Sequence, residues 1–323
     1  MSTEDSPENV TGPGKGRPPL ALIAGPTASG KSDLAVRLAL ALQERGRKAV
    51  VVNADSAQVY ADLAVLSARP TAEEMRGIEH RLFGAWDGAQ ACSAADWAQA
   101  AGREIGAIHQ AGGVPILVGG TGLYIRTLLD GIAPIPPIDP EVRRSVRAMP
   151  LDEAYTALRS EDPTRAAALA PADASRIARA LEVVRSTGRP ISKWQAQRSG
   201  GIADRVDIHP AILLPEREAL YERCDARFAS MLGTGAIGEV EALLARDLAP
   251  DLPVMRAIGV PEIVGYLRSE WSLEEARMRG AQATRNYAKR QFTWLRHQPP
   301  QDWPRIASNH FDELELFKTL LQM

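Results

Sequence analysis

The sequence predicts an α/β fold in which a parallel sheet is flanked by helices. Apolar, β-branched runs that fit buried strands alternate with stretches of helical periodicity over the first third of the chain. The expected strands cover Leu20 to Ala24, Ala49 to Val52 and Val114 to Val118, and Ile208 to Leu214 resembles a further strand returning to the sheet. Ligands bind at the carboxyl ends of the strands in such sheets, so the segments that follow the first three strands are expected to converge.

The first expected strand runs into a phosphate-binding motif. Its residues are Gly25-Pro26-Thr27-Ala28-Ser29-Gly30-Lys31-Ser32, which fit the pattern G-x-x-x-x-G-K-[ST]. Leu34, Leu38 and Leu42 then recur at helical spacing until Gly46. In this setting the backbone amides curl around a diphosphate at the positive end of the helix. We therefore predict a P-loop NTPase-like sheet with a diphosphate site, in which Lys31 adds charge and Ser32 can hold a phosphate-bound Mg²⁺.

Two other strand ends carry polar residues. The second strand ends in Asn53-Ala54-Asp55-Ser56, and the third runs into Gly119-Gly120-Thr121-Gly122-Leu123-Tyr124. From the residues alone, Asp55 is either an acid–base group or the cap of the turn that follows. Thr121 within its glycine-rich segment is by itself more typical of a turn residue than of a ligand.

The rest of the chain is predicted to be mainly helical. Residues 1–18 have the composition of a disordered leader, and a Pro-rich linker at 134–140 precedes a helical insertion domain at 141–204. The P-loop core then comprises 19–140 and 205–323, including the helical C-terminal part. Ser272 and Glu275 have the spacing of a capping box ahead of a long amphipathic helix.

Composition narrows the class of protein without identifying the activity. Cys92 and Cys224 lack metal-ligand spacing, and the sequence offers neither a signal peptide nor an apolar run of membrane-spanning length. We expect a cytoplasmic protein without a membrane partner, and a monomer, although the sequence does not determine the oligomeric state. The net charge of −2 excludes general affinity for nucleic acid but permits a local basic surface. Six Lys or Arg and no acid between Arg277 and His297 form such a surface.

The common P-loop classes can be compared on their motifs. A GTPase should carry Asn-Lys-x-Asp, and this chain contains no Asn-Lys pair. The run Val50 to Asp55 only loosely matches the apolar strand ending in Asp that is typical of motor ATPases. A small-molecule kinase and a related diphosphate-handling transferase both remain open on these residues.

Five segments in their order resemble one family, the tRNA dimethylallyltransferases, also called tRNA isopentenyltransferases. The resemblance runs from Leu20 to about Arg296, and the absence of a C-terminal zinc-binding segment favours the bacterial type. The segments are residues 25–32, Asp55-Ser56-Ala57-Gln58-Val59-Tyr60, residues 117–124, Arg176-Ile177-Ala178-Arg179-Ala180-Leu181-Glu182-Val183 with Thr187-Gly188, and Thr284-Arg285-Asn286-Tyr287-Ala288-Lys289-Arg290-Gln291.

The resemblance implies transfer of a dimethylallyl group from dimethylallyl diphosphate to N6 of the adenine 3′ of the anticodon, at tRNA position 37. The P-loop would bind the donor diphosphate, and Lys31, the Thr27 hydroxyl and Mg²⁺ on Ser32 would stabilise the charge that develops on it. Asp55 matches the family's general base, which orients the amine and accepts its proton. The adenine must leave the anticodon-loop stack to react.

The same resemblance implies contacts with the tRNA anticodon stem-loop. The implied residues are Asp55, Ser56, Ala57, Gln58, Thr121, Arg143, Ser175, Arg176, Ile177, Ala178, Arg179, Arg256, Arg285, Lys289 and Arg290. From spacing alone, Arg176 and Arg179 fit a solvated helix face opposite an apolar stripe. Tyr287, Gln291 and Trp294 share another helical stripe, which fits a core.

Departures from the family pattern fall in the segments that would contact tRNA. Ala57 stands where the family has Met, Ser175 where it has Gln, and Pro261 where it has Lys or Arg. Val65-Leu66-Ser67-Ala68-Arg69-Pro70 replaces an Ile-Gly-Thr-Ala-Lys-Pro-like run. Three alternatives are an isopentenyltransferase acting on free adenine nucleotides, a small-molecule kinase and a catalytically silent tRNA-binding protein. The first would not need the helical insertion or the basic terminal helix, the second would release ADP when given ATP and a phosphoryl acceptor, and intact Lys31, Ser32 and Asp55 disfavour the third.

Overall fold

The computed structural model describes residues 16–307 and 312–323 of the 323-residue chain, and most of the expected leader lies outside these ranges. The chain divides into two compact units. The first contains the residues up to Arg126 together with Ala203–Met323, and the second contains Thr127–Ile202. Within the described ranges, no helix combines the length and apolar character needed to cross a bilayer.

A six-stranded sheet forms the centre of the first unit, and all of its strand pairings are parallel. The strands are β1 (Pro19–Ala24), β2 (Ala49–Asn53), β3 (Glu79–Arg81), β4 (Val114–Gly119), β5 (Asp207–Leu213) and β6 (Arg305–Ile306). Their order across the sheet is β3-β2-β4-β1-β5-β6, which confirms the α/β class. The sequence does not predict β3 and β6, because segments of three and two residues are too short to show periodicity.

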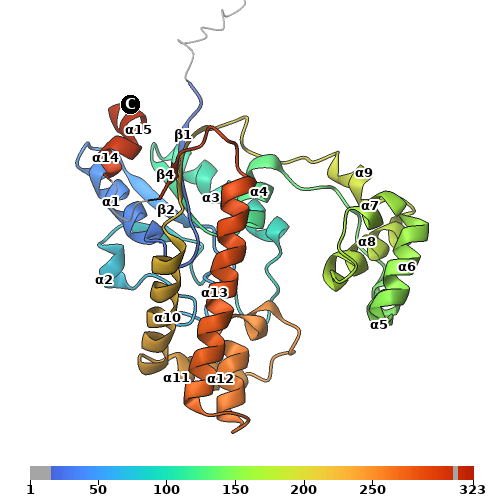
Figure 1. The fold of residues 1–323 in the computed structure, drawn as a ribbon. Helices are drawn as coiled ribbons and strands as arrows, with labels where there is room; N and C mark the ends of the chain where they lie inside the picture. The colour runs from blue at the N-terminus through green and yellow to red at the C-terminus, as the bar shows by residue number, and fades with distance from the viewer. Residues whose placement is uncertain (1–15, 308–311) are drawn as a thin grey trace, which may run out of the picture. The chain divides into compact units, whose positions relative to one another are not determined.

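Helices cover this sheet and extend from it (Figure 1). They are α1 (Lys31–Gln43), α2 (Ala72–Met75), α3 (Ala94–Gln110), α4 (Gly122–Asp130), α10 (Arg217–Gly233), α11 (Ala236–Leu244), the 3₁₀ helix η1 (Pro253–Arg256), α12 (Val260–Leu267), α13 (Leu273–His297), α14 (Glu313–Leu316) and α15 (Lys318–Gln322). The main core packs Leu34, Leu38 and Leu42 of α1, together with Phe317 and Leu320, against the sheet. The leucine spacing predicted from the sequence thus forms the buried face of α1.

The carboxyl ends of β1, β2 and β4 meet through backbone hydrogen bonds. The Gly25 amide donates to Gly119 O at 3.2 Å, and the Thr121 amide donates to Ala54 O at 3.2 Å. A Cβ atom on Gly119 would lie 2.2 Å from Ala54 O, so only glycine permits this approach. The predicted convergence of the three strand ends is present.

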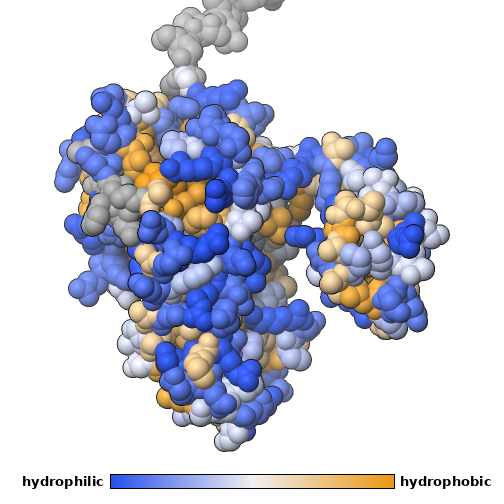
Figure 2. Space-filling view, viewed as in Figure 1, coloured by the Kyte–Doolittle hydropathy of each residue, from blue (hydrophilic) through white to orange (hydrophobic). Residues whose placement is uncertain are grey.

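Helices α10 and α13 lie side by side in the first unit (Figure 1). The capping box expected at Ser272 and Glu275 starts α13 at Leu273. Gly280 of α13 lets the helices come close, because a Cβ there would lie 2.0 Å from the Phe228 ring of α10. Over α13, on the face seen in Figure 2, hydrophilic side chains predominate.

The second unit is a small helical bundle with its own core. Its helices are α5 (Pro140–Ala148), α6 (Leu151–Glu161), α7 (Pro163–Ala167), α8 (Ala174–Thr187) and α9 (Ile191–Gln195), which follow the end of α4. The core includes Val146, Leu158, Ile177 and Leu181. This unit starts earlier than the insertion expected at 141–204, because the incoming and outgoing segments are hydrogen-bonded to each other between Ile132 and Ser199.

Two glycine substitutions test this packing. Gly119→Ala should destabilise the protein by about 1–3 kcal/mol, because the added methyl group meets the Ala54 carbonyl. The matched variant Gly102→Ala, inside α3 and with no atom within 4 Å of the added Cβ, should stabilise it by about 1 kcal/mol. Urea unfolding measures both changes. Wild-type stability of Gly119→Ala would contradict the close approach of the two turns.

Candidate active site

The P-loop forms a tight concave turn at the start of α1. Ala28 and Gly30 both have positive φ angles, of 62° and 86°. The hydroxyl of Ser29 is buried without a hydrogen-bond partner in the described ranges, and it lies 2.4 Å from where a Cβ on Gly25 would stand. Lys31 is buried and its Nζ donates to Pro26 O at 3.3 Å. The loop thus has the curvature and the free donors of an anion site.

Lys31 lies in an environment that disfavours its charge. Its pKa is lowered to about 8, mainly because the side chain is buried; the Asp55 carboxylate opposes this shift, and the cation of Arg227 adds to it. An anion in the loop would favour the protonated form. Lys31 is therefore suited to respond to an anionic ligand.

Two arginines of α10 lie beside the P-loop, and neither is predicted from the sequence. Arg227 donates a short hydrogen bond to the Thr27 hydroxyl, and burial lowers its pKa. Arg223 has buried Nε and Nη2 atoms without partners among the described residues. Both line a cavity of about 350 Å³ together with Ser29 and Gly30. Their spacing of four on one helix was the available signal, but it does not reveal which surface they face.

Asp55 lies at the end of β2 and is largely buried. Its Oδ1 accepts the Ala57 amide at 2.9 Å, and its own amide donates to Asn53 Oδ1 at 2.8 Å. No described residue donates a hydrogen bond to Oδ2. The turn-capping role predicted for Asp55 is present at Oδ1, and the acid–base role stays a prediction that would use Oδ2.

Thr121, Ser56 and Tyr287 form a hydroxyl cluster beside Asp55. The Ser56 amide donates to Thr121 Oγ1 at 3.0 Å, and the hydroxyls of Thr121 and Ser56 are 3.2 Å apart. The Tyr287 hydroxyl, from α13, lies close enough to both hydroxyls for them to influence its pKa. Burial, followed by the charge of Asp55, raises the pKa of Tyr287, so its phenol remains protonated at neutral pH. Tyr287 thus contributes to the site, whereas its helical stripe had indicated only a core position.

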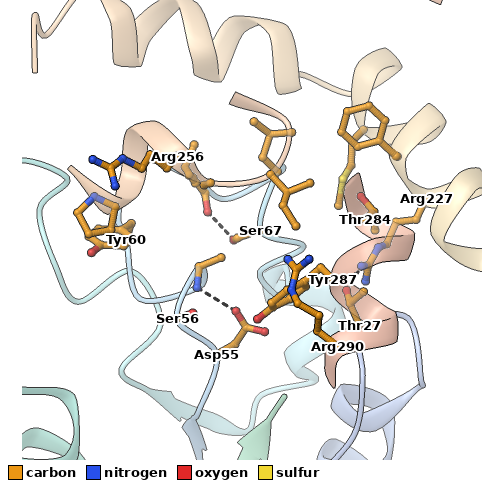
Figure 3. Close-up of a pocket in the computed structure, with 18 of the residues that line it drawn as sticks. Thr27, Asp55, Ser56, Tyr60, Ser67, Arg227, Arg256, Thr284, Tyr287 and Arg290 are labelled. Atoms are coloured by element: carbon orange, nitrogen blue, oxygen red, sulfur yellow. Dashed lines mark hydrogen bonds between the residues drawn. The ribbon is translucent and has the colours of Figure 1, made fainter. Parts of the chain in front are cut away.

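A second cavity, of about 310 Å³, is lined by Ser56 and Tyr287 of this cluster (Figure 3). Thr27, Asp55 and Arg227 gather on one side of it, with Tyr287 and Arg290 beside them (Figure 3). Its apolar lining consists of Leu63, Leu66, Phe228 and Met231 among others. Thr27 and Arg227 therefore connect the anion site to a pocket with an adjacent carboxylate.

Glu239 of α11 fixes the loop that carries part of this apolar lining. Its carboxylate accepts the amides of Ala64, Val65 and Leu66 at 2.6, 2.7 and 3.0 Å. Gln58 supports the same loop, because its Nε2 donates to the carbonyls of Ser67 and Ala68. The Gln58 side chain is thus engaged in holding the loop, although the family resemblance assigns it to tRNA contact.

The other residues of the first unit that were predicted to contact tRNA differ in exposure and in their partners. Ala57, Arg256 and Arg290 line the cavity. Lys289 is exposed on α13, and Arg285 is paired with Asp225 of α10. Arg285 must therefore break its ion pair with Asp225 before it can bind another anion.

In the second unit, the predicted contact residues separate into surface and core. Arg143 and Ser175 are exposed. The side chains of Arg176 and Arg179 are 70% and 43% exposed, and each is near an acid of its own helix region, Asp173 at 3.1 Å and Glu182 at 3.7 Å. Ile177 is fully buried and Ala178 packs against the same core. The side chain of Ile177 therefore belongs to the core, and only its neighbours present polar groups.

The residues near the P-loop fit a divalent cation that is coordinated mainly by the phosphate oxygens of a bound substrate. In the described part of the chain, no group of three or more His, Cys, Asp or Glu side chains is placed to bind a metal. The half-buried Ser32 at the start of α1 supplies one neutral oxygen. Mg²⁺ commonly takes few protein ligands and completes its shell with phosphate oxygens and water.

Comparisons with known proteins agree with this geometry. The family model described as IPP transferase matches residues 58–298, and the model described as isopentenyl transferase matches residues 18–95. The tRNA dimethylallyltransferase of Erythrobacter litoralis is 65% identical over 306 residues, covering 95% of this chain and 96% of that protein. The enzyme of the same name from Novosphingobium aromaticivorans is 66% identical over 280 residues, covering 87% of this chain and all of that one. The chain belongs to the tRNA dimethylallyltransferase family.

A solved structure of the family extends the comparison to the fold. The full-length tRNA isopentenylpyrophosphate transferase of Bacillus halodurans is 31% identical, with a TM-score of 0.66 and coverage of 93% of this chain and 94% of that one. This member of the family therefore has the P-loop NTPase-like fold that the sequence predicts.

The lowered pKa of Lys31 predicts a pH dependence of anion binding. Above pH 8 the lysine loses its proton, so the affinity for inorganic diphosphate should fall by up to about tenfold per pH unit. Calorimetry between pH 7 and 9.5 measures this slope. Lys31→Ala should bind diphosphate weakly with a flat profile, whereas the exposed control Lys48→Ala should keep the wild-type slope. A wild-type slope in Lys31→Ala would assign the titration to another group.

Proposed function

We propose that this protein transfers a dimethylallyl group from dimethylallyl diphosphate to N6 of the adenine at tRNA position 37, with release of diphosphate. The observation that carries the proposal is the cavity in which Asp55, with its unbonded Oδ2, faces the Thr27–Arg227 pair of the P-loop. The names of the relatives support it, as does a solved structure described as a eukaryotic dimethylallyltransferase acting on tRNA, which is 28% identical with a TM-score of 0.72 and coverage of 86% of this chain and 70% of that one.

The donor diphosphate binds in the P-loop on this proposal. Breaking the allylic C–O bond leaves negative charge on the diphosphate, and the loop amides, Lys31 and Arg227 are fixed before that charge develops. Arg227 also holds the Thr27 hydroxyl at the entrance to the cavity. The buried cations thus stabilise the leaving group without reorganisation of water.

Mg²⁺ is the proposed cation, with Ser32 as its protein ligand. When bound, it would supply Lewis-acid neutralisation of the diphosphate. The protein's own contribution is to present the Ser32 hydroxyl at the first turn of α1 and to exclude water around Lys31.

Asp55 acts on the acceptor. The amine of adenine is a poor nucleophile because its lone pair is delocalised into the ring. A carboxylate oxygen that accepts an N6 proton orients the amine and removes the proton during attack, which is typically worth about 10²–10⁴-fold. Oδ2 of Asp55 is available for this, while Oδ1 keeps the carboxylate in place through the Ala57 amide. The adenine must be unstacked from the anticodon loop to enter the cavity.

Recognition of tRNA is proposed to use two basic surfaces. One is α13, where Lys289 and Arg290 follow Arg285. The other is the second unit, where the exposed arginines include Arg143, Arg176 and Arg179. Their contacts are expected to be electrostatic and to tolerate changes in tRNA sequence.

One assay separates this function from the alternatives. Labelled dimethylallyl diphosphate is incubated with the protein and either bulk tRNA or AMP. We expect label in tRNA only. Label in AMP would favour the isopentenyltransferase that acts on free nucleotides, and release of ADP from ATP in the presence of a phosphoryl acceptor would favour a kinase.

Asp55→Asn tests the proposed base. The amide keeps the size of the side chain but cannot accept the proton, so the single-turnover rate should fall at least about 10²-fold with little change in tRNA affinity. Rapid-quench measurement with saturating donor and tRNA gives the rate. The exposed control Asp251→Asn should retain the wild-type rate. A near wild-type rate in Asp55→Asn would remove this residue from proton transfer.

Arg176→Ala combined with Arg179→Ala tests the second unit. The exposed Arg176–Asp173 pair is worth about 0–1 kcal/mol, and Glu182, the buried partner of Arg179, keeps its pair with Arg147, so both guanidinium groups can turn to a tRNA phosphate. The KM for tRNA should rise, and the slope of log affinity against log salt should fall by up to about one unit per lost contact. Donor affinity should stay constant, and the exposed control Arg159→Ala should keep the slope. An unchanged slope would make these arginines a solvated face.

A further inference from the structure

Gln291 is a buried amide in α13 that is only half satisfied. Its side chain is 5% exposed. Oε1 accepts the backbone amide of Thr27 at 2.8 Å, whereas Nε2 has no partner among the described residues. A buried donor without a partner costs about 1–3 kcal/mol. An apolar side chain would avoid this cost but would leave the Thr27 amide without its acceptor, so the glutamine is retained for its bond to the donor loop.

The position of Gln291 is set by the turns that follow β1 and β4. A Cβ atom on Gly120 would lie 2.4 Å from Gln291 Nε2 and 2.6 Å from Gly25 O. One helical turn before Gln291, the Tyr287 hydroxyl lies near those of Ser56 and Thr121, after β2 and β4. The same face of α13 thus meets all three strand ends that form the site.

Thr27 is consequently held from two helices. Arg227 of α10 bonds its hydroxyl, and Gln291 of α13 bonds its backbone amide. Thr27 is followed by Ala28 in the left-handed conformation, which a non-glycine residue adopts only when its surroundings enforce it. The hydrogen bond from Thr27 to Gln291 is one such constraint, because it fixes the Pro26–Thr27 peptide, one residue before Ala28.

We propose that Gln291 is a positioning residue for the transfer reaction. It fixes the Thr27 backbone, so that the Thr27 hydroxyl and Arg227 contact the leaving diphosphate. The inference rests on the proposed function, since it assigns Gln291 a part in that chemistry. It also gives α13 a second role, because the helix that carries Lys289 and Arg290 for tRNA is bonded directly to the donor loop.

The test is a double-mutant cycle between the two residues. Gln291→Met removes the acceptor at nearly constant volume, and Thr27→Val removes the hydroxyl at nearly constant shape. Gln291→Met alone should lower the single-turnover rate about 10- to 100-fold at saturating substrates, because small misplacements of catalytic groups have effects of this size. In the Thr27→Val background, the same substitution should change the rate less than about threefold. The affinity for tRNA should remain within about twofold of wild type, which a tRNA-contact role would not allow.

Controls separate positioning from packing. Gln291→Glu keeps an acceptor oxygen and should recover most of the rate lost in Gln291→Met. Gln298→Met, an exposed substitution at the end of the same helix, should retain the wild-type rate. If Gln291→Met does not fold, Gln291→Asn applies the same test with an amide too short to reach Thr27.

Two results would overturn the inference. One is a wild-type rate in Gln291→Met, and the other is an equal loss in both Thr27 backgrounds, which would show that Gln291 acts independently of the Thr27 hydroxyl. Transfer to tRNA by the unmodified protein is measured first. Absence of that transfer refutes the proposed function, whereas transfer with an additive cycle refutes only the role of Gln291.

Discussion

The candidate site depends on the backbone contact between the turns after β2 and β4. Ala54 donates to Val118 O at 2.7 Å and accepts the Thr121 amide at 3.2 Å, and Gly119 lies against the Ala54 carbonyl. Parallel register makes this contact possible, because it brings the carboxyl ends of neighbouring strands to one edge of the sheet. Gly119 in turn accepts the Gly25 amide, so the P-loop is joined to the same set of hydrogen bonds. Main-chain hydrogen bonds therefore set the relative positions of Asp55, Thr121 and the donor loop. Side-chain contacts then refine these positions.

The sequence predicts those parts of the site whose signals are local. The P-loop is a continuous motif between a strand and a helix, and Asp55 follows a β-branched run directly, so both can be placed from their neighbours in the chain. Arg227 contacts Thr27 across 200 residues, and no local pattern in α10 shows that it faces a phosphate loop. Gln291 is a related case. Helical periodicity correctly assigns it to a buried stripe, but periodicity does not show that the buried amide bonds the backbone of Thr27.

The donor side concentrates positive charge that the fold does not neutralise. Lys31 and Arg227 are buried near each other, and Arg223 has buried nitrogen atoms without partners in the described structure. Burying charge without hydrogen bonds or counter-charge is unfavourable, and one carboxylate, Asp55, partly offsets it. Such an arrangement is typical of sites where stability is given up so that cations are already oriented and partly dehydrated when an anion arrives. The unpaired Ser29 hydroxyl and Gln291 amide follow the same pattern.

On the surfaces proposed to bind tRNA, the cations lie beside acidic side chains, unlike those of the donor site. Arg176 and Arg285 are each beside a carboxylate that is partly exposed, and Arg179 lies near the buried Glu182, so the chain can carry a net charge of −2 and still present cations to a polyanion. Exposed pairs contribute little to stability, which means that a phosphate can replace the acid at small cost. Binding of this kind is weak for each contact and strongly salt-dependent. The pairing of the cations with acids also limits general attraction to nucleic acid. Buried unpaired cations thus suit a small donor that must be held rigidly, whereas exposed paired cations suit a large acceptor that must bind, react and leave.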